Sequence, residues 1–169
     1  MSHSLDHIMK PSSIAVIGAS TKPHTIGSDL MKRLIEFGFK GRIYPVNPKG
    51  GMIEGLQAYP SVLDIEGPVD MAVIVVNSKF VLSTIDQCHE KGVKGLVVIS
   101  AGFKESGKEG AEMEAQLYER VKKYGMRCVG PNCLGVVNTH PDEDHCGGLS
   151  AVLASTRTDA FYCSVDSWH

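Results

Sequence analysis

The chain has 169 residues, of which 43% are hydrophobic and 21% charged, and its formal net charge is −2. These values are typical of one soluble globular domain with a sizeable core, and they give no basic footprint for nucleic acid. We expect no membrane span and no secretory signal, because no apolar run approaches the roughly 18 residues needed and the amino terminus lacks a basic region before an apolar core. The five cysteines are scattered without a CxxC pair, which favours reduced thiols in a cytoplasmic protein.

Five short β-rich runs alternate with helical patterns, which predicts an α/β fold: a doubly wound parallel sheet with helices on both faces. The third run is apolar throughout, as expected for a strand covered on both faces. Residues 59–63 are expected to form a short turn of helix before it. The predicted strands are 14–17, 43–46, 71–76, 96–99 and 127–129.

Three longer helices are predicted between these strands. The first ends at Gly38, the second is capped by Ser78 and ends at Gly92, and the third spans 109–124 and ends at Gly125. Apolar residues at helical spacing mark the side of each helix that should face the sheet. These inward residues are Leu30, Met31, Leu34 and Ile35; Val81, Ile85 and Cys88; and Met113, Leu117 and Val121.

The pattern changes after about residue 138. We therefore expect one domain over residues 1–139 and an irregular tail over residues 140–169. The tail holds potential metal ligands, but their spacing fits no recognised zinc pattern. The chain also has no Ser-His-Asp arrangement with supporting context. We predict no metal site and no catalytic residue. The tail ligands considered are His140, His145, Cys146, Cys163 and His169.

Glycines and small or polar residues follow each predicted strand. In a doubly wound sheet, ligands bind at the carboxyl ends of the strands. Such residues let backbone amides approach phosphate groups and let a long ligand lie across the strands. The segments concerned are 18–20, 47–49, 77–78, 100–103 and 130–135.

The end of the second strand carries Asn47, Pro48 and Lys49, where dinucleotide-binding proteins normally place a carboxylate for a ribose hydroxyl. A lysine there can instead neutralise a phosphate on the ribose, either the 3′-phosphate of coenzyme A (CoA) or the 2′-phosphate of NADP. It can equally be a solvated loop lysine. The missing carboxylate disfavours NAD.

Two other segments each allow two interpretations. Gly18 and Gly27 lie nine residues apart, so the first loop is either a diphosphate cradle more open than GxGxxG or an ordinary turn between strand and helix. Residues 100–103 either line a channel for the pantetheine arm of CoA or form a tight turn. Asn132 is expected to bond loop backbone, and Cys133 is more easily explained as a small buried thiol than as a nucleophile.

Five segments in register give the chain a family resemblance. They are residues 11–20, 43–49, 69–73, 100–105 and 130–135. Together they resemble the N-terminal CoA-binding domain of the NDP-forming acyl-CoA synthetases. That family includes ADP-forming acetyl-CoA synthetase and is related to the alpha subunit of succinyl-CoA synthetase. The resemblance covers roughly residues 5–139.

The resemblance implies a Rossmann-like domain that holds CoA or acyl-CoA across its strand ends. At the third strand end the family usually has proline, whereas this chain has Asn77. Carried over residue by residue, the expected CoA contacts are Gly18, Ala19, Ser20, Thr21, Ile26, Gly27, Asn47, Lys49, Asn77, Ile99, Ser100, Ala101, Gly102 and Asn132.

The family's reaction uses a phosphorylated histidine on a later domain and an ATP-grasp domain, and we expect neither within these 169 residues. The chain alone should therefore bind CoA without turnover, with an ATP-grasp domain or subunit as a partner. Two alternatives remain: a stand-alone module that senses CoA, and an NADP-dependent oxidoreductase domain.

Overall fold

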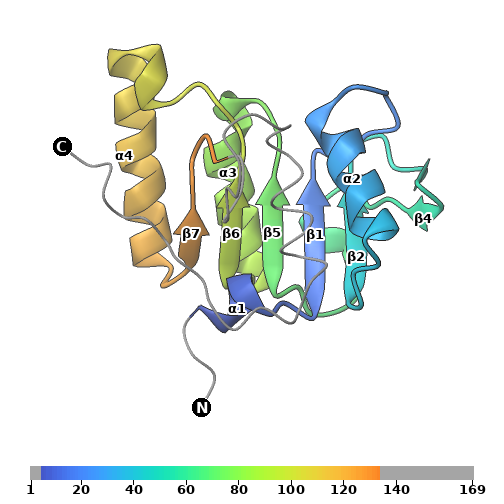
Figure 1. Ribbon diagram of the computed structural model, residues 1–169. Helices are drawn as coiled ribbons and strands as arrows, with labels where there is room; N and C mark the ends of the chain where they lie inside the picture. The colour runs from blue at the N-terminus through green and yellow to red at the C-terminus, as the bar shows by residue number, and fades with distance from the viewer. Residues whose placement is uncertain (1–4, 134–169) are drawn as a thin grey trace.

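The computed structural model describes residues 5–133. At its centre is a parallel sheet in the order β2-β1-β5-β6-β7 (Figure 1). All five strands run in one direction, so their carboxyl ends meet at one edge, at the top of Figure 1, which we call the carboxyl edge. The strands are β1 (Ser13–Ile17), β2 (Arg42–Val46), β5 (Met71–Ile74), β6 (Gly95–Val98) and β7 (Arg127–Val129).

The strands form because their apolar, largely β-branched residues are buried on both faces of the sheet. In β1, Ile14 and Val16 pack on one face, while Ala15 and Ile17 pack on the other. All five residues of β1 are buried, which explains why the strand lacks a polar alternation. The predicted α/β fold with a doubly wound parallel sheet is confirmed.

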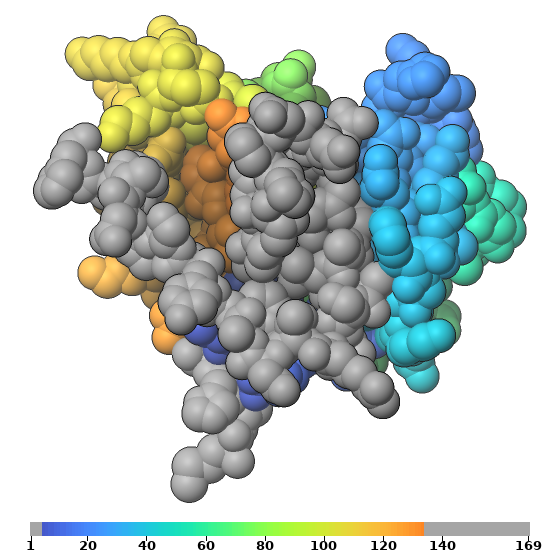
Figure 2. Space-filling model, in the orientation of Figure 1, coloured from blue at the N-terminus to red at the C-terminus, as the bar shows by residue number. Residues whose placement is uncertain are grey.

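Helices cover the two faces of the sheet in separate groups. The short α1 (Asp6–Met9) and α2 (Ile26–Glu36) pack on one face. The other face is covered by α3 (Ser78–Lys91), α4 (Lys108–Lys123) and the 3₁₀ turn η1 (Val62–Asp64). In the space-filling view, α2 and the first turns of α4 lie at opposite ends of the carboxyl edge (Figure 2).

The predicted helices and strands are present, with two local corrections in the helices and one in the third strand. Ser78 is the first residue of α3 and not its cap: the Asn77 side chain accepts a hydrogen bond from the Lys79 N–H at 3.2 Å. Ile35 is 41% exposed, because the buried stripe of α2 needs only Leu30, Met31 and Leu34. The third strand ends at residue 74, two residues earlier than predicted.

The sequence patterns did not predict α1, the hairpin of β3 (Met52–Ile53) and β4 (Leu56–Gln57), or the 3₁₀ turn η2 (Lys104–Ser106). Glu54 and Gly55 connect the hairpin strands, and both have positive φ, as in a type I′ turn. A strand of two residues is too short to show an alternating pattern.

Within residues 5–133, no helix is both long and apolar enough to cross a bilayer. The predicted tail, the boundary at residue 139 and the potential ligands of the tail lie outside the described residues. Cys88, Cys128 and Cys133, the cysteines within the described part, form no disulfide with one another.

Candidate functional site

The two glycines of the first loop come together at the carboxyl edge. A Cβ on Gly27 would overlap the carbonyl oxygen of Gly18, so the start of α2 lies directly against the end of β1. Gly18 itself has φ of +99°, and a Cβ there would lie 2.9 Å from the carbonyl oxygen of Val75. This close approach needs glycine at both positions.

The loop feeds into α2 through a cap that the sequence analysis missed. The Thr25 hydroxyl accepts a hydrogen bond from the Ser28 N–H at 3.3 Å and donates one to the Lys22 carbonyl at 2.9 Å. A threonine directly before an apolar helical pattern is the sequence signal that could have identified it. The positive end of the α2 dipole faces the carboxyl edge, where it favours an anion.

Ser28 is the second residue missed. Among the described residues, its hydroxyl is the buried side-chain oxygen that lacks a hydrogen-bond partner. It lies one residue after Gly27, within the first turn of α2. Buried polar atoms without partners are uncommon and often occur at functional positions.

Asn47 joins the loop after β1 to the loop after β2. Its side-chain amide donates a hydrogen bond to the Ala19 carbonyl at 2.7 Å, and its side-chain oxygen accepts one from the Lys49 N–H at 2.9 Å. Its own N–H donates to the Tyr59 carbonyl at 2.9 Å. These bonds place exposed Lys49 beside the first loop, so the two predicted segments form one cluster.

A second cluster lies at the ends of β5, β6 and β7. The buried Ser100 hydroxyl donates to the Val76 carbonyl at 2.5 Å, and the Asn132 N–H donates to the Ser100 carbonyl at 3.0 Å. Gly102 has φ of +101°, and a Cβ there would lie 2.7 Å from the Ser78 hydroxyl. The Ser100 hydroxyl is therefore used within the fold.

A carboxylate fixes the loop that follows β6. Glu105 accepts hydrogen bonds from the Gly102 N–H at 2.6 Å and the Phe103 N–H at 3.2 Å. The bond from Gly102 lowers the pKa of Glu105 below its ordinary value, so the group is ionised at neutral pH. Phe103 is fully buried, which anchors the same loop in the core.

The structure therefore sorts the sequence-predicted residues into two neighbouring clusters on one edge. The first contains Gly18, Ala19, Ser20, Gly27, Asn47 and Lys49, and the second contains Asn77, Ile99, Ser100, Ala101, Gly102 and Asn132. Thr21 and Ile26 are exposed beside the first cluster. Cys133 is half-buried, and its N–H donates to the Val98 carbonyl at 3.3 Å. Residues 5–133 contain no group of three or more His, Cys, Asp or Glu side chains placed to hold a metal ion.

The chain is similar to known CoA ligases. It is 54% identical to acetate–CoA ligase [ADP-forming] I subunit alpha of Pyrococcus furiosus, over 80% of this chain and 30% of that subunit. It is 45% identical to 4-hydroxybutyrate–CoA ligase [ADP-forming] of Nitrosopumilus maritimus, over 78% of this chain and 19% of the ligase.

A solved structure gives the same result. The dinucleotide-forming acetyl-coenzyme A synthetase 1 of Candidatus Korarchaeum cryptofilum, in complex with phosphate and ADP, matches with a TM-score of 0.76 and 44% identity. The match covers 88% of this chain and 30% of that one, so the chain spans under a third of these relatives. Because residues 12–139 match the family described as CoA binding domain, the chain belongs to that family.

Proposed function

We propose that this chain binds CoA or acyl-CoA along its carboxyl edge, as the CoA-binding part of an NDP-forming acyl-CoA synthetase. The observation that carries this proposal is the set of Asn47 hydrogen bonds, which holds Lys49 beside the loop between β1 and α2. The names of the relatives support the same ligand, because they are CoA ligases and CoA synthetases.

Each cluster would hold one part of the coenzyme. The N–H of Gly18 already bonds the Val46 carbonyl, so residues 19–20 and the start of α2 would offer backbone N–H groups to the diphosphate, and the Lys49 ammonium group would pair with the ribose 3′-phosphate. Thr21 and Ile26 border this end. The backbone of residues 99–102, with Asn77 and Asn132 beside it, receives the pantetheine arm.

The reaction served would be acyl-CoA + NDP + phosphate interconverting with acid + CoA + NTP. In it, this chain would bind and orient CoA, while an ATP-grasp domain or subunit would supply the nucleotide chemistry. We place the protein in the cytoplasm, where the cysteine thiols of its described part would stay reduced.

Reversing the charge of Lys49 tests the orientation of the ligand. We expect Lys49→Glu to weaken CoA binding about tenfold, since an exposed ion pair contributes up to about 1 kcal/mol and the variant replaces attraction with repulsion. Binding of dephospho-CoA, which lacks the 3′-phosphate, should change much less. Calorimetric titration of both ligands measures the two effects.

A matched control is Lys94→Glu, which makes the same charge change at an exposed position before β6, at the opposite edge of the sheet. It should leave both affinities unchanged. Equal losses for CoA and dephospho-CoA in the Lys49 variant would exclude the proposed pairing.

Lys49 would also suit the 2′-phosphate of NADP, so an NADP-dependent oxidoreductase domain is the second candidate. A thermal-shift titration with CoA, NADPH and NADH separates the two, because a ligand that binds the native state raises the melting temperature. We expect CoA to raise the melting temperature and NADPH and NADH to leave it unchanged. A melting temperature that rises with NADPH but not with CoA would favour the second candidate.

A further inference from the structure

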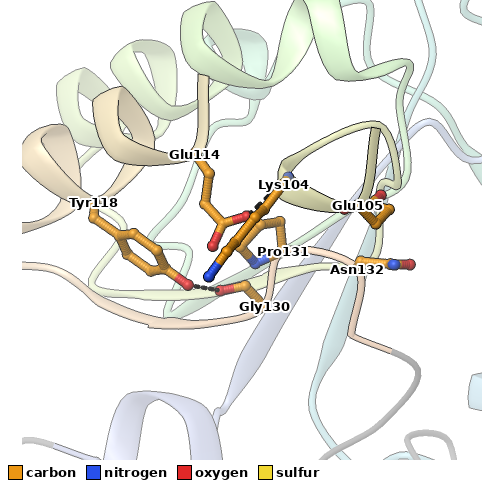
Figure 3. A pocket seen from close by; sticks show the side chains of 7 residues that line it. All are labelled: Lys104, Glu105, Glu114, Tyr118, Gly130, Pro131 and Asn132. Atoms are coloured by element: carbon orange, nitrogen blue, oxygen red, sulfur yellow. Dashed lines mark hydrogen bonds between the residues drawn. The ribbon is translucent and has the colours of Figure 1, made fainter. Parts of the chain in front are cut away.

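A pocket opens at the far end of the carboxyl edge, beyond the site proposed for the nucleotide. Its volume is about 490 Å³, and it lies between η2, α4 and the segment after β7 (Figure 3). The residues that line it are Lys104, Glu105, Glu114, Tyr118, Gly130, Pro131 and Asn132. The lining therefore combines the charged ends of Lys104, Glu105 and Glu114 with apolar surface, which includes the Tyr118 ring and Pro131.

The polar groups of the pocket are held in place by the surrounding fold. Glu114 is only 8% exposed, and its carboxylate accepts a hydrogen bond from the Lys104 N–H at 3.1 Å. The Tyr118 hydroxyl donates to the Gly130 carbonyl at 3.4 Å. The Lys104 side chain runs across the pocket, with its ammonium end toward the Tyr118 hydroxyl (Figure 3).

The pocket lies where the thiol end of a bound CoA would arrive. At about 4.8 Å per strand, the three spacings from β1 to β7 amount to about 14 Å. The pantetheine arm, about as long as four extended residues, also reaches about 14 Å from the diphosphate. Asn132 connects the two places, because it lines the pocket while its N–H bonds the Ser100 carbonyl.

The lining selects among acyl groups by its hydrogen-bonding chemistry. An alkyl group would displace water from the charged ends of Lys104 and Glu114 without replacing its hydrogen bonds, which costs affinity. An acyl group with a free carboxylate, such as succinyl, would meet a lining with two negative charges, on Glu105 and Glu114, against the one positive charge of Lys104. A hydroxyl suits the pocket better, since it can donate to the Glu114 carboxylate or to the Tyr118 oxygen and accept from the Lys104 ammonium group.

We propose that this pocket receives the acyl group of a bound acyl-CoA and prefers an acyl group that carries a hydroxyl. The inference rests on the proposed function, because it takes the direction of the coenzyme from Lys49 at one end of the edge. It goes further by assigning Glu114, Tyr118 and Lys104 as the residues that determine acyl specificity.

Calorimetric titration of the full chain with CoA, butyryl-CoA, 3-hydroxybutyryl-CoA and succinyl-CoA tests this preference. Butyryl-CoA and 3-hydroxybutyryl-CoA differ by one hydroxyl group. We expect 3-hydroxybutyryl-CoA to bind about tenfold more tightly than butyryl-CoA, the gain expected for one hydrogen bond in a charged site. Succinyl-CoA should bind more weakly than 3-hydroxybutyryl-CoA.

Tyr118→Phe keeps the exposed ring and removes the hydroxyl, so it should reduce the preference to about threefold or less with CoA affinity unchanged. Tyr124→Phe is the matched control, because that hydroxyl bonds Asp86 and does not line the pocket. It should keep the tenfold ratio.

Equal binding of butyryl-CoA and 3-hydroxybutyryl-CoA, tightest binding of succinyl-CoA, or an unchanged ratio in Tyr118→Phe would overturn this inference alone. Failure of all four ligands to bind, CoA included, would overturn the proposed function and this inference with it.

Discussion

Asn47 and Asn77 both follow a strand at the carboxyl edge, but their side chains make different hydrogen bonds. Asn47 donates to the Ala19 carbonyl and accepts from the Lys49 N–H, so it needs both halves of its amide. Asn77 caps α3 and uses only its oxygen, which accepts from the Lys79 N–H. An aspartate can replace the second asparagine but not the first, because a carboxylate has no hydrogen to donate.

Asn47→Asp should therefore lower the free energy of unfolding by about 1–3 kcal/mol, the cost of leaving a carbonyl unpaired against a carboxylate. Asn77→Asp is the matched change and should alter stability by less than about 0.5 kcal/mol, because aspartate caps helices as well as asparagine does. Urea denaturation at pH 7 measures both. Equal effects would show that the Asn47 bridge does not contribute to stability.

At the scale of whole elements, the sequence predicted the strands and helices whose apolar residues are buried at regular intervals. The five strands and three long helices each carry apolar residues at a regular spacing, and Gly38, Gly92 and Gly125 mark where those helices end. The hairpin β3–β4 and the helix α1 carry no period because they are too short. Their positions depend on contacts with distant residues, such as Gly95 against the carbonyl of His7.

The candidate site could likewise be predicted only in part. The topology of a doubly wound sheet brings strand ends to one edge, so segments 18–20, 47–49 and 100–103 could be grouped from sequence. The contact of Gly27 with Gly18 and the bonds of Asn47 could not, because they depend on side-chain direction. The pocket beside α4 was also missed, since Glu114 and Tyr118 lie on a helix for which only the apolar side was predicted from the sequence.

The contact between α3 and α4 includes a polar joint near the carboxyl-terminal ends of both helices. The Tyr124 hydroxyl donates to the Asp86 carboxylate at 2.8 Å, and the Arg120 guanidinium lies 3.2 Å from the same oxygen. The Tyr124 ring also stacks on His89, with ring centres 3.9 Å apart. The hydrogen bond to Asp86 raises the pKa of Tyr124, because only the neutral phenol can donate.

This joint should make part of the stability depend on alkaline pH. The folded-state pKa of Tyr124 lies above its unfolded value of about 10, so the hydrogen bond contributes fully below pH 10 and is lost as pH rises through the folded pKa. The melting temperature of the wild type should exceed that of Tyr124→Phe by a constant amount from pH 7 to 9. The difference should shrink above pH 10, as measured by differential scanning fluorimetry.

Asp86→Asn is the control for this joint, because it keeps an oxygen that accepts from the phenol but removes the charge. It should keep part of the melting-temperature difference at pH 8. A difference between wild type and Tyr124→Phe that grows above pH 10 would contradict the assigned cause.

At the scale of the whole molecule, burial of thiols makes the fold sensitive to base. Cys88 lies on α3 with no exposed surface, and burial raises its pKa to about 12. Burial, with a smaller effect of Cys133, also raises the pKa of Cys128 to about 12. In the unfolded chain a thiol ionises near pH 8.5, so the unfolded state gains free energy from ionisation that the folded state does not.

Stability should therefore be complete below about pH 8 and fall as pH rises from about 9 toward 12. Each buried thiol lowers the free energy of unfolding by up to about 1.4 kcal/mol for each pH unit in that range. Cys88→Ala should lower the free energy of unfolding at pH 7, because it leaves a cavity. Between pH 9 and 11, however, the unfolding free energy of the variant should fall less steeply than that of the wild type, by up to about 1.4 kcal/mol per pH unit. Urea denaturation at half-unit pH steps measures the slope.

Val81→Ala separates the cavity from the ionisation. Val81 is as fully buried on the same helix, so its truncation also leaves a cavity but removes no titrating group. Its unfolding free energy should run parallel to that of the wild type across the alkaline range, whereas the Cys88→Ala curve should converge with the wild-type curve. Parallel curves for both variants would mean that Cys88 ionises alike in the folded and unfolded chain, and alkaline unfolding would then have to originate at Cys128 or at the tyrosines.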